Sequence, residues 1–178
     1  KIKQDKKLLL IVLLAAAGLS PQVVTETIYA LAVARTPAWC PTEVRLVATE
    51  EGWRRARLAL LSEDPGWLHR LRAEYSLPPI RLDETTVVVL ENEGTRLADI
   101  RSESDATTAA DKITNMVREL TGDPECALHV SLAGGRKTMG FYLGTALSLY
   151  GRAQDRLSHV LVSPPYESNP GFYYPSRH

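Results

Sequence analysis

The chain has 178 residues, enough for one domain of ordinary size with a substantial core. Its 21 lysines and arginines balance 21 aspartates and glutamates, so the formal net charge is zero. This balance argues against a protein that binds long nucleic acid through a broad basic face, and against a polybasic membrane anchor. Cys40 and Cys126 lack metal-ligand spacing and are too few for a disulfide scaffold, so we expect a reducing, cytoplasmic setting.

The first twenty residues have two interpretations. Four lysines precede an apolar run over residues 8–14, and three alanines follow it, which is the order found in a signal peptide. That run is too short to span a bilayer, and a strand buried in a parallel sheet is continuously apolar in the same way. Because the rest of the chain needs a first strand, we expect residues 8–16 to form it, with no membrane partner.

Beyond this strand, segments with helical spacing alternate with apolar or β-branched runs. The first helix is expected to begin with Ser20 as its N-cap and Pro21 at the first helical position. The patterns predict helices over residues 21–35, 51–62, 65–75, 103–121 and 136–150, and strands over residues 43–49, 86–91, 126–132 and 159–163. The expected apolar anchors of the second and third helices are Trp53, Leu60, Trp67 and Leu71.

This alternation predicts an α/β fold of the doubly wound, Rossmann-like kind, in which helices cover both faces of a mostly parallel sheet. No repeat, low-complexity segment or linker interrupts it, so we expect one domain over residues 1–178. The tail over residues 164–178 is rich in proline and aromatic residues and is expected to be extended. Its rings more often pack on their own domain or on a second copy than on a nucleobase.

Two loops are candidate anion sites. In the first, Gly18 permits an unusual dihedral or a close approach, and Ser20 and Pro21 begin a helix. A helix N-terminus offers free N–H groups and a partial positive charge, which suit a phosphate. Taken alone, this loop is better explained as an ordinary turn that needs a glycine and a cap. Its candidate ligand-binding residues are Gly18, Leu19, Ser20, Pro21, Gln22 and Thr25.

The second loop gives a stronger signal, because it joins a predicted strand to a helix and contains two glycines followed by two cations. No acid lies between residues 131 and 140 to neutralise those cations. Cations at a helix N-terminus oppose the macrodipole at about 0.3–1 kcal/mol each, so a bound anion explains the pair better than a solvated turn does. The candidate residues here are Ser131, Ala133, Gly134, Gly135, Arg136, Lys137 and Thr138.

The second loop is not a Walker A motif, which needs a glycine directly before the lysine, and it is not a G-x-G-x-x-G dinucleotide fingerprint. If the strands run in the common order 3-2-1-4-5, the first and fourth strands are neighbours. Both loops then follow the carboxyl ends of neighbouring strands and line one crevice at the switch point of the sheet.

Three stretches of the sequence resemble a known family. GLSPQVVTETIYAL (residues 18–31) resembles the opening of a CRISPR-associated Rossmann-fold (CARF) domain, and the stretch from SLAGGRKTMG to GFYYP (residues 131–175) is similar to its second half. LADIRSESDATTAADKI (residues 97–113) resembles the middle segment of the subgroup found in ring nucleases and in CARF–ribonuclease effectors. The resemblance covers nearly the whole chain and is weak over residues 51–85.

The resemblance implies a homodimer that binds a cyclic oligoadenylate, with cyclic tetra-adenylate as the expected ring. It assigns catalytic roles to Ser20, Arg136 and Lys137, a backbone cradle to the two glycines before Arg136, and a contact to adenine or to a lid to Asp105. The Arg-x-x-x-x-His motif of the associated ribonucleases is not apparent in this sequence.

For a ring nuclease we expect a reaction that needs neither metal nor cofactor. The ribose 2′-OH attacks the adjacent phosphorus, while Lys137 and Arg136 stabilise the developing charge and Ser20 orients the attacking hydroxyl or a phosphate oxygen. No histidine lies in either loop, and no carboxylate cluster indicates a metal nuclease. The alternatives are a sensory domain of a larger CRISPR effector that binds the ring without cutting it, and a generic Rossmann phosphate-binding enzyme.

Overall fold

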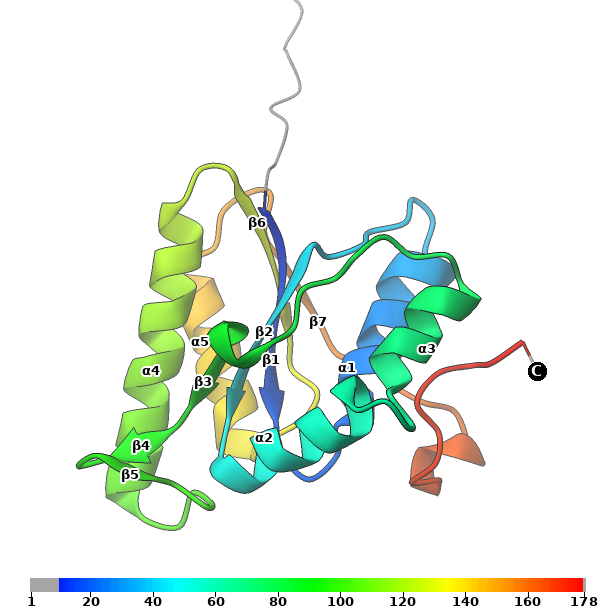
Figure 1. Cartoon of the computed structure of the whole chain (residues 1–178). Coiled ribbons are helices and arrows are strands. Elements are labelled where there is room, and N and C mark those ends of the chain that lie inside the picture. The colour runs from blue at the N-terminus through cyan, green and yellow to red at the C-terminus, as the bar shows by residue number, and fades with distance from the viewer. Residues whose placement is uncertain (1–9, 178) are drawn as a thin grey trace, which may run out of the picture.

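The computed structural model describes residues 10–177, in which strands and helices alternate along the chain (Figure 1). The strands are β1 (Leu10–Ala17), β2 (Glu43–Ala48), β3 (Val87–Val89), β4 (Glu91–Asn92), β5 (Thr95–Arg96), β6 (Cys126–Ser131) and β7 (Arg156–Ser158). The α-helices are α1 (Gln22–Tyr29), α2 (Glu50–Ala56), α3 (Trp67–Glu74), α4 (Glu103–Gly122) and α5 (Lys137–Tyr150). Shorter helical turns are η1 (Ala30–Ala34) and η2 (Arg57–Leu61), which continue α1 and α2, and η3 (Glu84–Thr86) and η4 (Tyr166–Ser168).

The main sheet has five strands in the order β3-β2-β1-β6-β7, and every neighbouring pair is parallel. The expected doubly wound order is therefore confirmed. β1 is the central strand, with β2 on one side and β6 on the other. The chain changes direction across the sheet between β1 and β6, which makes their carboxyl ends the switch point where such folds hold ligands.

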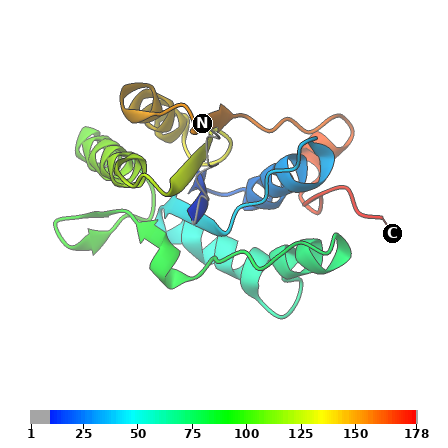
Figure 2. The ribbon, with the colours of Figure 1, turned by 90° about the horizontal axis from the view of Figure 1, so that it is seen from above.

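Alternate residues of β1 face opposite helical layers (Figure 2). Leu13 and Ala15 lie in a core with α1, α2 and α3, whereas Leu14 and Ala16 lie in a second core with α4 and α5. Because both faces of the strand are covered, its sequence is continuously apolar rather than alternating. Among residues 10–177 no helix has both the length and the apolar character needed to cross a bilayer.

The N-terminal predictions hold with small shifts. The apolar run forms β1 from residue 10 to residue 17, while residues 8 and 9 of the predicted strand lie outside the described part. Ser20 is not the N-cap of the first helix: Pro21 takes that position without a side-chain cap, and α1 begins at Gln22. The hydroxyl of Ser20 is therefore left exposed and free of a capping role.

The predicted strand over residues 159–163 is wrong. Its β-branched sequence is typical of a strand, but β7 ends at Ser158. The neighbouring strand β6 ends at Ser131, and the last hydrogen bond between the two runs from the N–H of Leu132 to the carbonyl of Ser158 at 2.8 Å. Past this point the β6 chain turns into the glycine loop, so residues 159–163 have no backbone left to pair with.

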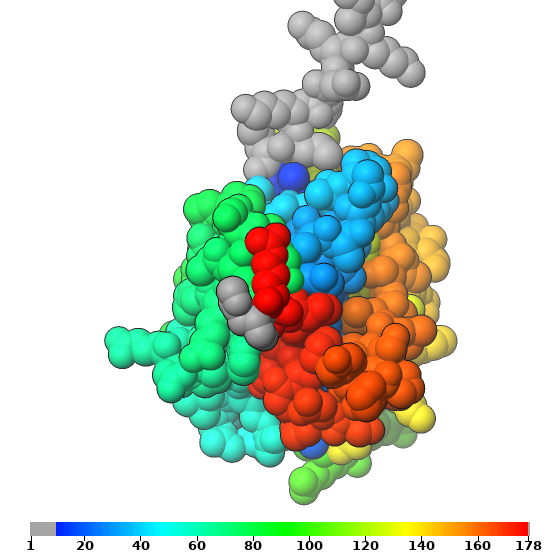
Figure 3. Space-filling view, turned by 90° about the vertical axis from the view of Figure 1, so that its right-hand side faces the viewer, coloured from blue at the N-terminus to red at the C-terminus, as the bar shows by residue number. Residues whose placement is uncertain are grey.

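The C-terminal tail packs on its own domain, beside α1 and α3 (Figure 3). The ring of Tyr173 stacks on Trp67 with centroids 4.8 Å apart, and Tyr174 is buried. Glu74 at the end of α3 accepts a hydrogen bond from the Tyr174 hydroxyl at 2.9 Å. The aromatic rings of the tail therefore pack on the rest of this chain. Trp67, one of the expected anchors of the third helix, is half-buried in the same cluster.

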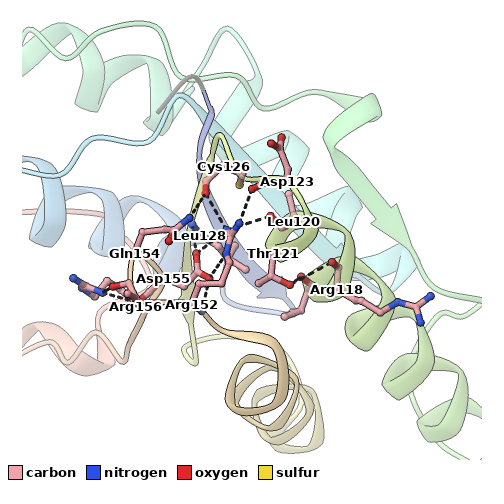
Figure 4. Close-up of polar contacts among 12 residues, drawn as sticks. Arg118, Leu120, Thr121, Asp123, Cys126, Leu128, Arg152, Gln154, Asp155 and Arg156 are labelled. Carbon is pink, nitrogen blue, oxygen red and sulfur yellow. Dashed lines mark hydrogen bonds and ion pairs between the residues drawn. The ribbon is translucent and has the colours of Figure 1, made fainter. Parts of the chain in front are cut away.

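At the amino end of β6 a polar network surrounds Arg152, which follows α5 (Figure 4). Its guanidinium donates to the Asp155 carboxylate at 2.9 and 3.0 Å, to the carbonyl of Cys126 at 2.9 Å and to the carbonyl of Asp123 at 2.5 Å. Burial alone raises the pKa of Asp155, but hydrogen bonds from Arg152 and from the backbone N–H of Leu128 outweigh it and the pKa lies below its usual range. The network joins the end of α4, the start of β6 and the turn before β7.

We expect Arg152→Ala to lower the free energy of unfolding by about 3 kcal/mol, because it leaves the buried Asp155 carboxylate without its ion-pair partner. Urea denaturation at pH 7 measures the change. The matched control is Arg118→Ala on the exposed side of α4, which should change stability by no more than about 0.5 kcal/mol. Equal stability of the two variants would contradict a structural role for the network.

Candidate functional site

Two loops meet at the carboxyl ends of β1 and β6: the β1–α1 loop (residues 18–21) and the β6–α5 loop (residues 132–136). A Cβ built on Gly18 would lie 2.9 Å from the Cα of Gly135, so the two backbones touch only because neither residue has a side chain there. Gly134 has a φ of 88°, and a Cβ on it would lie 2.5 Å from the carbonyl oxygen of Ala16. The glycines are thus required by packing, and the structure brings the predicted loops together.

The β6–α5 loop presents a row of unused backbone donors. Within residues 10–177, the N–H groups of residues 134–138 donate to no acceptor of the protein. The same holds for Gln22 and Val23 at the start of α1. Both helices begin at this edge of the sheet, and neither has a side-chain cap. Such free donors at a helix start, with the positive end of the dipole behind them, suit an anion.

Lys137 is the first residue of α5 and its side chain is exposed. It makes no ion pair with any other residue that the structure describes. Thr138 follows it and is also exposed, while Ser20 and Leu19 lie exposed on the neighbouring loop. The first turn of α5 contains no acid, so an arriving anion meets Lys137, free N–H groups and two hydroxyls.

Arg136 has a partner that its own loop does not supply. Its guanidinium binds Asp99 in a two-point ion pair, with Nε donating to Oδ1 at 2.9 Å and Nη2 donating to Oδ2. The hydrogen bond from Arg136 holds the pKa of Asp99 at about 2. The expectation that both cations of the loop lack an acid is therefore wrong for Arg136, because an acid 37 residues earlier in the sequence reaches it.

Asp99 was missed because no local signal marks it. It lies in the segment between the small β4–β5 hairpin and α4, and the hairpin turns through Glu93 and Gly94, both with positive φ. The Asn-Glu-Gly sequence of that turn is a usable signal for a hairpin, but it does not predict which loop the following segment approaches. The family resemblance of residues 97–113 implies a role for Asp105 and none for Asp99.

Several predicted ligand-binding residues lie beneath the loops rather than on them. Thr25 is fully buried and its hydroxyl donates to the carbonyl of Gln22 at 3.0 Å. Ser131 is buried, and its Oγ accepts from the N–H of Ala133 at 3.3 Å and lies 3.5 Å from the Thr27 hydroxyl. Ala133 and Pro21 are also buried, so these residues support the loops.

Asp105 has a structural role in this arrangement. Its carboxylate accepts from the N–H groups of Arg101 and Ser102 at 3.0 Å, and its own N–H binds the Ser102 hydroxyl. This is the capping box that begins α4. The hydrogen bonds from Arg101 and Ser102 lower the pKa of Asp105, so the carboxylate is charged and committed to the helix start.

Within residues 10–177, neither of the two loops contains a histidine or a carboxylate side chain. His129 lies in the sheet, where burial lowers its pKa to about 4 and its Nε2 shares a 2.7 Å hydrogen bond with the Ser158 hydroxyl. In the part of the chain that the structure describes, no cluster of three or more His, Cys, Asp or Glu side chains could hold a metal ion. What the two loops offer is an exposed surface with Lys137, Ser20 and unused backbone N–H groups, which is chemically suited to an anion.

Gly134→Ala tests whether the contact between the loops is structural. The positive φ and the clash with Ala16 should lower the free energy of unfolding by about 2 kcal/mol. The control is Gly122→Ala at the end of α4, where a Cβ meets nothing within 4 Å and should raise stability by about 0.5 kcal/mol. Thermal unfolding of both variants gives the comparison, and a neutral effect of Gly134→Ala would contradict the packing argument.

Comparison with solved structures shows the fold. The chain is similar to Enterococcus italicus Csm6 bound to cyclic hexa-2'-fluoro-hexa-dAMP, with a TM-score of 0.54, 16% sequence identity and 90% of this chain covered. The match covers 35% of that chain, so this chain spans about a third of the length of that Csm6. The Rossmann-like fold predicted from the sequence is thereby confirmed.

Comparison with protein families and curated proteins adds the assignment. No curated protein matches the sequence. Residues 20–178 match a family described as CRISPR-associated protein NE0113 (Cas_NE0113). The match includes the second half of the β1–α1 loop, the whole β6–α5 loop, Asp99 and all of α5. The chain belongs to the Cas_NE0113 family of CRISPR-associated proteins.

Proposed function

We propose that this protein binds a cyclic oligoadenylate across the two loops of a homodimer and slowly cleaves it. Cleavage would switch off the type III CRISPR signalling that this ring carries. The observation that carries the proposal is the row of free N–H groups over residues 134–138 beside the unpaired Lys137. A phosphodiester accepts such donors at each non-bridging oxygen. The likeness to a Csm6 bound to a cyclic hexanucleotide analogue supports this choice of anion.

A second copy of the chain would turn this open surface into an enclosed site. Two recesses of about 680 and 600 Å³ occur elsewhere on the surface, and neither includes the two loops. The exposed face of α5 contains two large apolar side chains, Phe141 (68% exposed) and Leu149 (70% exposed), which lie about two turns apart. Because α5 begins at Lys137, pairing through this face brings two copies of the loop together, and a ring with repeating phosphates meets the same groups twice.

Cleavage in such a site follows from positioning and charge. The ribose 2′-OH attacks its neighbouring phosphorus, the 5′-oxygen leaves, and the products carry a 2′,3′-cyclic phosphate and a 5′-OH. Lys137 and the N–H groups stabilise the extra charge on the phosphorus oxygens, while Ser20 orients the hydroxyl. Arg136 contributes while it stays paired with Asp99, which fixes the position of its guanidinium and leaves its remaining N–H groups for the phosphate.

The second candidate function is binding without cleavage, as the sensory domain of a larger effector. The observation that favours it is the match to only 35% of a longer chain whose title names a bound ring analogue. The absence of a histidine or carboxylate side chain from the two described loops is also consistent with a slow or silent reaction. Incubation with labelled cyclic tetra-adenylate and cyclic hexa-adenylate in EDTA separates the two. Linear products with cyclic-phosphate ends indicate cleavage, and intact ring that stays bound to the protein indicates sensing. Failure to bind either ring would contradict both.

Lys137→Ala should reduce ring cleavage by about 100-fold or more, because one charge that stabilises the transition state is lost. It should also reduce the dependence of ring binding on salt, since one phosphate contact disappears. Lys112→Ala on the exposed side of α4 is the matched control and should leave both measurements unchanged. Unchanged cleavage by Lys137→Ala would contradict its assigned role.

Phe141→Asp should convert the dimer to a monomer, because it places a charge in the apolar face of α5. Analytical ultracentrifugation at micromolar concentration measures the change, and ring affinity should fall with it. The control is Leu58→Asp on η2, an exposed leucine that lies with the opposite helical layer. A monomeric wild-type protein, a dimer that tolerates Phe141→Asp, or a dimer that Leu58→Asp disrupts equally would contradict the proposed interface.

A further inference from the structure

A cleft of about 680 Å³ lies along α1, away from the two loops. Its walls come from α1, the start of α3, residues 160–163 and the C-terminal tail, which Figure 3 shows beside α1. Six aromatic residues belong to the lining: Tyr29, Trp67, Tyr166, Phe172, Tyr173 and Tyr174. This volume falls in the range of about 300–1,000 Å³ typical of small-molecule sites. The lining favours a flat, largely apolar ligand.

Among the residues that the structure describes, Glu26 is the one acidic residue that lines this cleft. Within residues 10–177 its carboxyl group makes no hydrogen bond or ion pair. Burial raises the pKa of Glu26 to about 7, so both the neutral and the charged forms are present at neutral pH. A half-buried carboxyl without a partner lowers the stability of the fold, which is typical of a residue kept for binding.

The position of Glu26 relates the cleft to the loops. Gln22 and Glu26 are four residues apart on α1, so they share one face of the helix and are separated by about 6 Å along its axis. The cleft therefore begins about one helical turn beyond the β1–α1 loop and extends toward Trp67 and the tail. A ligand in the cleft does not need to contact Lys137.

The chemistry of the lining selects a class of ligand. A neutral carboxyl group presents a donor and an acceptor side by side, which complements a ring nitrogen next to an exocyclic amino group. Aromatic walls pack against the flat faces and edges of a heteroaromatic ring. The rings of Tyr166 and Phe172, with centroids 4.9 Å apart, both belong to this lining. Both features fit an amino-bearing nucleobase.

We propose that this cleft is a nucleobase site in which Glu26 binds the amino edge of the base and the aromatic walls hold its ring. The base comes either from a free nucleoside or nucleotide, or from the ring held at the loops. Only the second source rests on the proposed function, so recognition of the base can be tested without any cyclic oligonucleotide.

The first measurement is calorimetric titration of the wild-type chain with adenosine and with purine riboside, which lacks only the amino group. Adenosine should bind saturably, and purine riboside should bind about 10-fold more weakly because the donor to Glu26 is missing. Quenching of tryptophan fluorescence provides a second readout, since Trp67 lines the cleft. No adenosine binding, or equal binding of the two ligands, would overturn the proposal.

Variants of Glu26 separate recognition from folding. Glu26→Met should lose adenosine binding by about 10-fold, whereas Glu26→Gln should keep it, because an amide also presents a donor beside an acceptor. Glu26→Met should unfold at a temperature no lower than wild type at pH 8, since it removes an unpartnered carboxylate. Wild-type affinity in Glu26→Met would overturn the role of Glu26.

Lys137→Ala tests whether the cleft is separate from the two loops, and Glu26→Met identifies the source of the base. Lys137→Ala should leave adenosine affinity unchanged, and loss of adenosine binding would contradict a separate site. If Glu26→Met weakens cyclic oligoadenylate binding as well, the base belongs to the ring; if it weakens only adenosine binding, the cleft takes a free nucleoside. Failure of ring binding in wild type, with adenosine binding intact, would overturn the proposed function alone.

Discussion

The close contact of Gly18 with Gly135 determines how the two loops of the candidate site meet. The strands β1 and β6 are neighbours at the centre of the sheet, so the loops that follow them lie side by side. The two loop backbones approach within van der Waals distance because Gly18 and Gly135 have no Cβ. The starts of α1 and α5 are brought together as a result, and so are the unused N–H groups of both helices. Binding groups from segments more than a hundred residues apart thereby share one edge.

Much of the fold could be predicted, because the constraints that produce it are local or periodic. Buried parallel strands are continuously apolar, helices repeat every three to four residues, and right-handed crossovers leave few strand orders. The segment over residues 159–163 shows where this reasoning stops. Its composition is that of a strand, but strand formation needs a partner, and the partner turns away at Ser131. Only the register of β6 against β7 contains that information.

The site was predicted in part for a related reason. Glycines, cations and a helix start are adjacent in the sequence, so the β6–α5 loop could be identified from one short stretch of residues. The ion pair between Arg136 and Asp99 depends on how the segment after a small hairpin approaches that loop. No short stretch of sequence contains this information. Ser131 and Thr25 lie in the predicted loops but face inward, because the direction of a side chain at the end of a strand or in a first helical turn depends on register. The Glu26 cleft is assembled from four separate segments and has no sequence signature of its own.

The Arg152 network lies at the opposite end of β6 from the glycine loop (Figures 1 and 4). The elements that anchor this strand are therefore remote from the groups that meet a ligand. Within the loop itself, the glycines serve packing, whereas Lys137 and Thr138 are exposed. Substitution of these exposed side chains therefore does not require rebuilding of the strand beneath them. If the loop binds an anion as proposed, the preferred size and charge of that anion can change while the glycine backbone stays fixed.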